Sequence, residues 1–268
     1  MNNTNNYEHS LLFSRMLGII NEDELKVLEN KKIAVPGAGG VGFTHAETLV
    51  RMGVGAINIA DFDTFGPENM NRQFGCTIST IGQEKVSILN ERLNDINPNI
   101  KTQTFEGISY ENIDDFLDGV DLVCDAMDYF VIEPRILMYK RAREKGIPVI
   151  VSGPVGFGAS LHVFSPDGMS FEEFFDLKAS DTTDEKLLKF GIGLTPSELY
   201  LDYQPSACLN FNTKKVSSIS SSCLLASSLT GSASLLQLLG SQSFKAVPYC
   251  YQLDLRSFKF EEVLFRKK

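Results

Sequence analysis

A glycine-rich segment carries the residue types and spacing that most directly indicate chemistry. Gly37, Gly39 and Gly42 follow a short β-branched run and precede an apolar pattern of helical period. These three positions form the pattern Gly-x-Gly-x-x-Gly, and with Gly40 they also fit the tighter pattern Gly-x-Gly-Gly-x-Gly. Glycine permits the positive φ and the close backbone approach that a phosphate-binding turn needs, and a helix start presents free N–H groups to an anion. Asp61 follows nineteen residues after Gly42, where a carboxylate would meet ribose hydroxyls. The segment predicts a nucleotide site without identifying the nucleotide.

Two cations further along the chain bear on the choice between NAD and ATP, which the glycine pattern alone fits equally well. Arg72 follows the second predicted strand, and Lys85 opens the next predicted helix. A triphosphate needs such cations, because Arg supplies planar bidentate donors and Lys a point charge. A dinucleotide oxidoreductase has no need for two cations beside its ribose loop. The plain alternative is a pair of solvated surface cations.

Alternating strand and helix patterns predict the scaffold that would position these residues. Strands are predicted from residue 32 and at 56–60, 101–105, 121–125 and 147–152. They alternate with helical patterns at 41–52, 82–95 and 132–144. Such alternation predicts an α/β fold, with a Rossmann-like, doubly wound and mostly parallel sheet. A closing hairpin at 248–255 and 258–265 would add an antiparallel C-terminal extension. Residues 178–189 are charged and are expected to be exposed, and residues 194–212 to be irregular.

Composition narrows the class of protein and its partners. The 268 residues carry a formal net charge of −9, which argues against a nucleic-acid partner. Residues 216–244 hold no charge, but nine of the twenty-five residues from 216 to 240 are serine. That run is too polar for a membrane span, so we expect a buried helix of small residues and no membrane association.

The five cysteines bear on metal binding and on compartment. They are Cys76, Cys124, Cys208, Cys223 and Cys250, and no two form a CxxC pair. A structural zinc held by local cysteine pairs is therefore not expected. An odd number of cysteines, without a recognisable signal peptide, fits a reducing cytoplasm.

Five motifs in order resemble those of a known family. They are residues 37–42 (GAGGVG), 61–63 (DFD), 69–73 (NMNRQ), 82–85 (GQEK) and 124–128 (CDAMD). In sequence and spacing they are similar to those of the ThiF/MoeB/HesA adenylyltransferases, the bacterial relatives of ubiquitin-activating enzymes. Ser14-Arg15 resembles the N-terminal arginine motif of that family. The resemblance is specific over residues 13–164 and looser over 224–265.

The resemblance implies a role for each matched residue. The backbone at Gly39 and Gly40 would approach the phosphates of ATP, and Asp61 would hold the ribose. Other matched positions would complete the ATP site, namely Gly37, Gly42, Asp63, Asn69 and Gln73. Catalysis would fall to Arg72, Lys85 and Asp128, with Asp128 holding Mg²⁺. Arg15 would reach across a homodimer into the neighbouring subunit.

The chain departs from the family at several positions. Many relatives carry two CxxC pairs for zinc and a catalytic cysteine in a crossover loop, and this chain has no such pairs. Cys208 lies in roughly that loop region and Cys223 at the start of the serine-rich helix, but burial or an incidental thiol explains each more simply. Tyr129 stands after Asp128, where relatives often have Asn.

The resemblance implies one adenylation domain over residues 1–268. Within it we expect an N-terminal helical segment (1–30), a nucleotide-binding core (31–165), a variable crossover or substrate region (166–215), and a C-terminal helix with closing strands (216–268). The implied reaction joins the carboxylate of a peptide or small-protein C-terminus to AMP and releases pyrophosphate. Alternatives are a small-molecule or tRNA-bound carboxylate, and a non-catalytic ATP-binding subunit.

Overall fold

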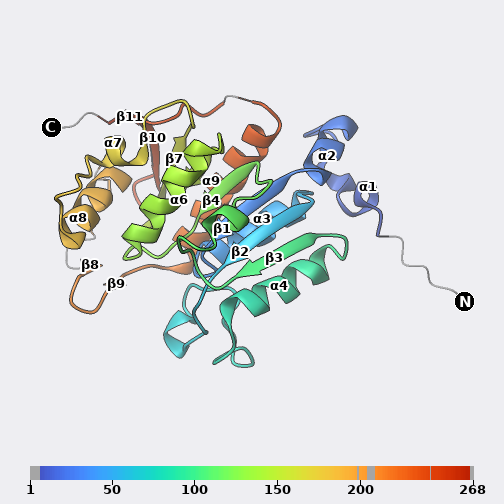
Figure 1. Cartoon of the computed structure of the whole chain (residues 1–268), viewed down its shortest axis with the longest axis horizontal. Helices are drawn as coiled ribbons and strands as arrows, with labels where there is room; N and C mark the ends of the chain where they lie inside the picture. Colours follow the sequence, from blue (N-terminus) through green and yellow to red (C-terminus); the bar gives the residue numbers. More distant parts are fainter. Residues whose placement is uncertain (1–6, 198, 204–208, 242, 266–268) are drawn as a thin grey trace, which may run out of the picture.

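One mixed sheet forms the centre of the molecule. The structure is a computed structural model that describes residues 7–197, 199–203, 209–241 and 243–265. The strand order is β11-β10-β7-β5-β4-β1-β2-β3, and β6 (Pro154–Val155) pairs with β7 (Figure 1). The parallel part comprises β1 (Lys32–Pro36), β2 (Ala56–Ala60), β3 (Lys101–Phe105), β4 (Leu122–Asp125) and β5 (Val149–Val151). This confirms the predicted Rossmann-like parallel core.

The antiparallel extension occupies one edge of the sheet. Strand β7 (Gly158–Phe164) pairs antiparallel with both β5 and β10 (Tyr249–Asp254). Strand β11 (Lys259–Leu264) then pairs with β10 through the predicted hairpin. The sheet is therefore mostly parallel at its centre and antiparallel toward the C-terminus, as expected.

Helices cover both faces of the sheet, because alternate residues of its buried strands point to opposite sides. On β1, Ile33 and Val35 join one apolar core, whereas Ala34 joins the other. The first core is closed by α2 (Glu22–Glu29), α3 (Gly42–Arg51), α4 (Lys85–Ile96) and α9 (Ser220–Leu238). The second is closed by α5 (Ile113–Phe116), α6 (Ile132–Glu144), α7 (Phe171–Phe175) and α8 (Thr183–Leu194).

Helix α9 is the buried, serine-rich helix that the sequence predicts. It lies against α3, where an added Cβ at Gly231 would come within 2.8 Å of Thr48 Cγ2. Its hydroxyls meet a buried histidine: His45 Nδ1 is 2.8 Å from Ser227 Oγ, and His45 Nε2 is 3.3 Å from Thr230 Oγ1. No helix within the described ranges is long and apolar enough to cross a membrane.

Most of the charged segment at 178–189 is exposed, as expected, but it also contains the first part of helix α8, which the sequence did not predict. The helix begins with a capping box, in which Thr182 accepts a hydrogen bond from Glu185 N and the Glu185 carboxylate accepts one from Thr182 N. Its inward side buries Leu187 and Phe190 against the second core. The charged side chains of α8 face outward. The segment that looked merely charged in the sequence therefore forms an amphipathic helix.

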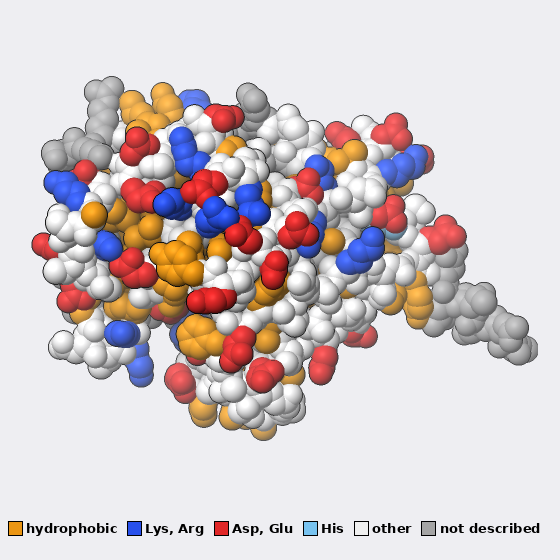
Figure 2. Space-filling view, viewed as in Figure 1, with side chains coloured by type: hydrophobic (Ala, Val, Ile, Leu, Met, Phe, Trp, Pro, Cys, Tyr) orange, Lys and Arg blue, Asp and Glu red, His pale blue; other side chains and the backbone are white. Residues whose placement is uncertain are grey.

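Charged side chains of both signs are interspersed over the face of the molecule drawn in Figure 2.

The short elements that remain are α1 (His9–Leu12), the 3₁₀ turns η1 (Ser14–Met16) and η2 (Pro67–Asn69), and the small hairpin of β8 (Leu209–Asn210) and β9 (Lys215–Val216).

Candidate functional site

The glycine loop links β1 to α3 at the carboxyl ends of the parallel strands. Gly37 has φ +104°, and a Cβ there would lie 2.2 Å from Ala126 O at the end of β4. A Cβ at Gly42 would lie 1.9 Å from Gly37 O. Both distances are far below any real carbon–oxygen contact, so these two glycines are needed for the loop to close on itself. At Gly39 the nearest atom to a Cβ would be Gln73 Nε2 at 3.6 Å, an ordinary contact distance, so the fold itself does not require glycine there.

Asp61, immediately after β2, ties the glycine loop to the next strand. Its Oδ2 accepts a hydrogen bond from Ala38 N at 2.6 Å, and its Oδ1 accepts one from Asp63 N at 2.8 Å. Each carboxylate oxygen has a second lone pair, so both can also accept from a ribose hydroxyl. Asp61 thus fixes the loop and still presents acceptors at the position predicted for the ribose.

Lys85 lies at the first position of α4, as predicted, and is almost fully buried with an exposure of 6%. Its Nζ is 3.0 Å from Asp63 Oδ2, while its backbone N donates to Asp63 O at 3.0 Å. The Lys85 side chain is 7% exposed, whereas that of Asp63 is 53% exposed. The Lys85 ammonium thus lies beneath the loop that begins at Asp61, where the Asp63 carboxylate balances its charge.

The segment from η2 to α4 holds three further predicted residues, of which Arg72 and Gln73 lie beside Gly40 and Gly39. Asn69 is buried, and its Oδ1 accepts from Gly66 N at 2.9 Å, so it holds the turn. Arg72 Nη1 donates to Glu68 O and to Asn71 Oδ1, each at 3.0 Å. Gln73 is 7% exposed, and its Oε1 has no hydrogen-bond partner. The side-chain amide of Gln73 lies beside Gly39, with its Nε2 3.6 Å from the position of an added Cβ.

Asp128 follows β4 on a loop that touches the glycine loop through Ala126. Its side chain is exposed, and its Oδ1 accepts a hydrogen bond from Phe130 N at 2.9 Å. No cluster of three or more Cys, His, Asp or Glu side chains suited to a metal occurs within the described part of the chain. Mg²⁺ is commonly bound by one or two carboxylates together with substrate phosphates, so the single carboxylate of Asp128 fits a nucleotide-borne Mg²⁺.

A buried charge network beneath this loop was missed by the sequence reasoning. Arg135 Nε is 2.9 Å from Asp125 Oδ2, and the two side chains are 2% and 0% exposed. Tyr139 donates to the same Oδ2 at 3.1 Å, and burial raises the pKa of its hydroxyl well above the ordinary value. Arg135 also donates to Met127 O at 2.6 Å, and Asp125 Oδ1 accepts from Met127 N at 3.1 Å. The network therefore holds the backbone directly before Asp128. An aspartate that ends an apolar strand was its only signal in the sequence.

Arg15 lies apart from this constellation within the chain. It is exposed in η1, next to α1, and His9 of α1 contacts Gly53 O at 2.7 Å. Gly53 precedes β2, so this segment lies toward the amino ends of the parallel strands, opposite the glycine loop. The structure brings the other predicted residues together through contacts between neighbouring loops, but it does not bring Arg15 to them.

Cys223 contacts the glycine loop from the first turn of α9. A Cβ at Gly40 would lie 3.2 Å from Cys223 Sγ and 3.7 Å from Arg72 Cγ. The thiol is buried, and burial raises its pKa, which the hydrogen bond with Ser218 and the charge of Arg72 partly oppose. A raised pKa disfavours the nucleophilic thiolate, so the geometry gives Cys223 a packing role. Cys208 lies outside the described residues.

Comparison with known proteins places the chain among related sequences. The model of the ThiF family matches residues 13–268. The chain is 39% identical over 142 residues to a tRNA threonylcarbamoyladenosine dehydratase of Bacillus subtilis, covering 52% of this chain and 55% of that protein. It is 32% identical over 202 residues to ubiquitin-like modifier-activating enzyme 5 of Aedes aegypti, covering 69% and 49%. The chain thus spans about half the length of the curated relatives it matches.

Solved structures with the same fold include two at low sequence identity. PaaA superposes with a TM-score of 0.71 at 19% identity, over 96% of this chain and 74% of that one. The Escherichia coli tRNA N6-threonylcarbamoyladenosine dehydratase in complex with ATP superposes with a TM-score of 0.63 at 20% identity, over 86% and 95%. These likenesses concern the fold alone.

Proposed function

The chain belongs to the ThiF family, and from that premise we propose that it activates a carboxylate with ATP as an acyl-adenylate. The observation that carries the proposal is the meeting of the glycine loop with Asp61, buried Lys85 and Arg72 at one end of the parallel sheet. A buried cation and a backbone free of side chains are what a triphosphate needs. The fold itself leaves room for a Cβ at Gly39, so a glycine at this position is consistent with the close approach of a ligand.

The reaction requires two anions to meet. A carboxylate oxygen of the substrate attacks the α-phosphorus of ATP, and the bond from that phosphorus to the bridging oxygen of pyrophosphate breaks. No proton transfer is needed at this step, so the residues act by positioning and by neutralising charge. Lys85 and Arg72 offset the negative charge of the triphosphate. The triphosphate and the Asp63 carboxylate then compete for the Lys85 ammonium. Mg²⁺ held by Asp128 would further neutralise the phosphates.

For the substrate we propose the C-terminal carboxylate of a peptide or small protein. The match to ubiquitin-like modifier-activating enzyme 5 extends over 69% of this chain, whereas that to the Bacillus dehydratase covers 52%. The formal charge of −9 opposes the approach of a polyanion such as tRNA. Both observations favour a polypeptide substrate.

Pyrophosphate exchange into ATP tests this function, with a panel of C-terminal peptides as carboxylate donors. We expect exchange with at least one peptide, and a loss of at least about 100-fold in Arg72→Ala and in Asp128→Ala. Arg51→Ala, an exposed arginine at the end of α3, serves as the matched control. Exchange that survives both site substitutions would refute the residue roles.

A tRNA-bound carboxylate is the second candidate, favoured by the 39% identity to the Bacillus tRNA threonylcarbamoyladenosine dehydratase. Gel-shift binding to bulk tRNA at several salt concentrations separates the two substrates. Micromolar or tighter binding that weakens steeply with salt would support tRNA and count against the peptide.

We propose further that the protein works as a homodimer in which Arg15 serves the neighbouring subunit. Its exposure in η1, away from its own glycine loop, supports a role in trans. Mixing Arg15→Ala with Asp128→Ala subunits should restore part of the exchange activity, because the mixed dimer contains one complete site. No restoration, despite mixed dimers on native mass spectrometry, would contradict this arrangement.

A further inference from the structure

Two residues directly after Asp128 contact the crossover region of the chain. The Tyr129 hydroxyl donates a hydrogen bond to Leu187 O in α8 at 2.6 Å. The Phe130 ring meets Phe211, which lies between β8 and β9, with 6.0 Å between ring centroids. Two separate parts of the crossover region, α8 and the hairpin of β8 and β9, thus touch the loop that carries Asp128.

The contact of Tyr129 depends on a glycine in α8. In an α-helix the carbonyl of residue 187 accepts from the N–H of residue 191, so the two positions share one face. An added Cβ at Gly191 would lie 2.5 Å from the Tyr129 hydroxyl oxygen but 3.5 Å and 3.6 Å from the nearest ring carbons. Because Gly191 has no side chain, a notch is left in the surface of α8. The Tyr129 hydroxyl enters this notch and donates to the second lone pair of Leu187 O.

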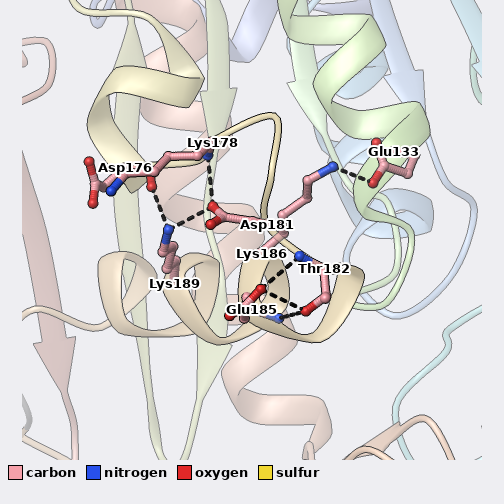
Figure 3. Close-up of polar contacts among 8 residues, drawn as sticks. All are labelled: Glu133, Asp176, Lys178, Asp181, Thr182, Glu185, Lys186 and Lys189. Carbon is pink, nitrogen blue, oxygen red and sulfur yellow. Dashed lines mark hydrogen bonds and ion pairs between the residues drawn. The ribbon is translucent and has the colours of Figure 1, made fainter.

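Ion pairs and a hydrogen bond join helix α8 to neighbouring segments, so a displacement of these segments can pass to α8. Figure 3 shows Lys186 reaching Glu133 of α6, at 2.7 Å, and Lys189 reaching Asp181 and the Asp176 carbonyl, at 2.6 Å and 2.9 Å. The guanidinium of Arg135, which fixes the backbone before Asp128, also stacks 4.6 Å from the centroid of the Phe190 ring. Helices α6 and α8 and the loop after β4 therefore form one connected unit.

We propose that Tyr129 is a positioning residue that couples α8 to the loop bearing Asp128. Movement of α8 on substrate binding shifts that loop, and nucleotide binding at the loop orders α8. The functional half of this inference rests on the proposed ATP site, whereas the contact itself does not.

A double-mutant cycle in thermal unfolding tests the contact without requiring activity. Alanine is favoured over glycine inside a helix, so Gly191→Ala should raise the melting temperature by about 2–4 °C in a Tyr129→Phe background. In the wild-type background the same substitution should lower it, because the new Cβ meets the hydroxyl. Equal effects of Gly191→Ala in the two backgrounds would overturn the inference.

Hydrogen–deuterium exchange tests the coupling. At saturating ATP and Mg²⁺, amides of residues 187–195 should exchange at least about threefold more slowly in the wild type, and Tyr129→Phe should lose this protection. Tyr110→Phe, at an 81% exposed tyrosine, is the matched control and should keep it. Equal protection in Tyr129→Phe and wild type would overturn the coupling. Calorimetry that detects no ATP binding by the wild type would instead refute the proposed function, and the coupling with it.

Discussion

Replacing Arg135 with methionine tests whether the buried ion pair beneath the Asp128 loop holds the fold. The substitution keeps an unbranched, apolar stem but leaves the Asp125 carboxylate, 0% exposed, without its cation. Removing one partner of a buried pair costs about 3–5 kcal/mol, because the remaining charge cannot be solvated. The Tyr139 hydroxyl and Met127 N still donate hydrogen bonds to Asp125, so the carboxylate keeps two of its donors. We therefore expect the lower part of that range, about 3–4 kcal/mol.

Urea unfolding followed by circular dichroism measures this loss. Arg143→Met in the same helix is the control, because Arg143 is exposed and donates a single hydrogen bond to Gly168 O at 2.7 Å. Its cost should stay within about 1 kcal/mol. A loss for Arg135→Met no larger than that of the control would refute the structural role given to the network.

Three further predictions concern the glycine loop and the buried histidines. Gly42→Ala places a Cβ 1.9 Å from Gly37 O, so calorimetry should show ATP affinity reduced by more than about 100-fold; near-normal affinity would contradict the role of this glycine in loop closure. Gly39→Ala has no atom nearer than 3.6 Å, so the melting temperature should change by less than about 2 °C while ATP affinity falls at least about tenfold; unchanged affinity would place the phosphates elsewhere. Burial lowers the pKa of His45 to about 3 and that of His162 to about 4, whereas both take up protons near the ordinary value of 6.5 when unfolded. The free energy of unfolding should therefore fall as pH drops below about 6.5, by up to about 1.4 kcal/mol per pH unit for each histidine, and His45→Asn should make the urea-derived slope shallower.

The nucleotide loop could be predicted from the sequence because its determinants are local. Gly37 and Gly42 stand next to a strand and a helix start, and Asp61 and Lys85 stand at the ends of predicted elements. Parallel strands bring such ends to one edge of the sheet, so their meeting follows from the fold class. The spacing of the motifs then identified the family.

Contacts that depend on long-range packing could not be predicted in this way. Arg135 belongs to a helix that begins after Asp128, and nothing local indicates that its guanidinium turns back to Asp125. The charged residues of α8 concealed a helix, because Gly191 and Gly193 lower helix propensity and the burial of Phe190 stabilises it only in the folded protein. Tyr129 departs from the family pattern, and its partner, Leu187 O, lies 58 residues further along the chain, beside Gly191.

In our proposal the glycine loop holds a triphosphate and not a dinucleotide. Thermal unfolding of the full chain with ATP and Mg²⁺, compared with NAD at the same concentration, tests this most directly. A ligand present at 100 times its dissociation constant stabilises the folded state by about 2.7 kcal/mol, which shifts the melting temperature by several degrees. We expect this shift with ATP and Mg²⁺, about half of it or less in Gly39→Ala at the same ATP concentration, and none with NAD. Stabilisation by NAD and not by ATP would contradict it.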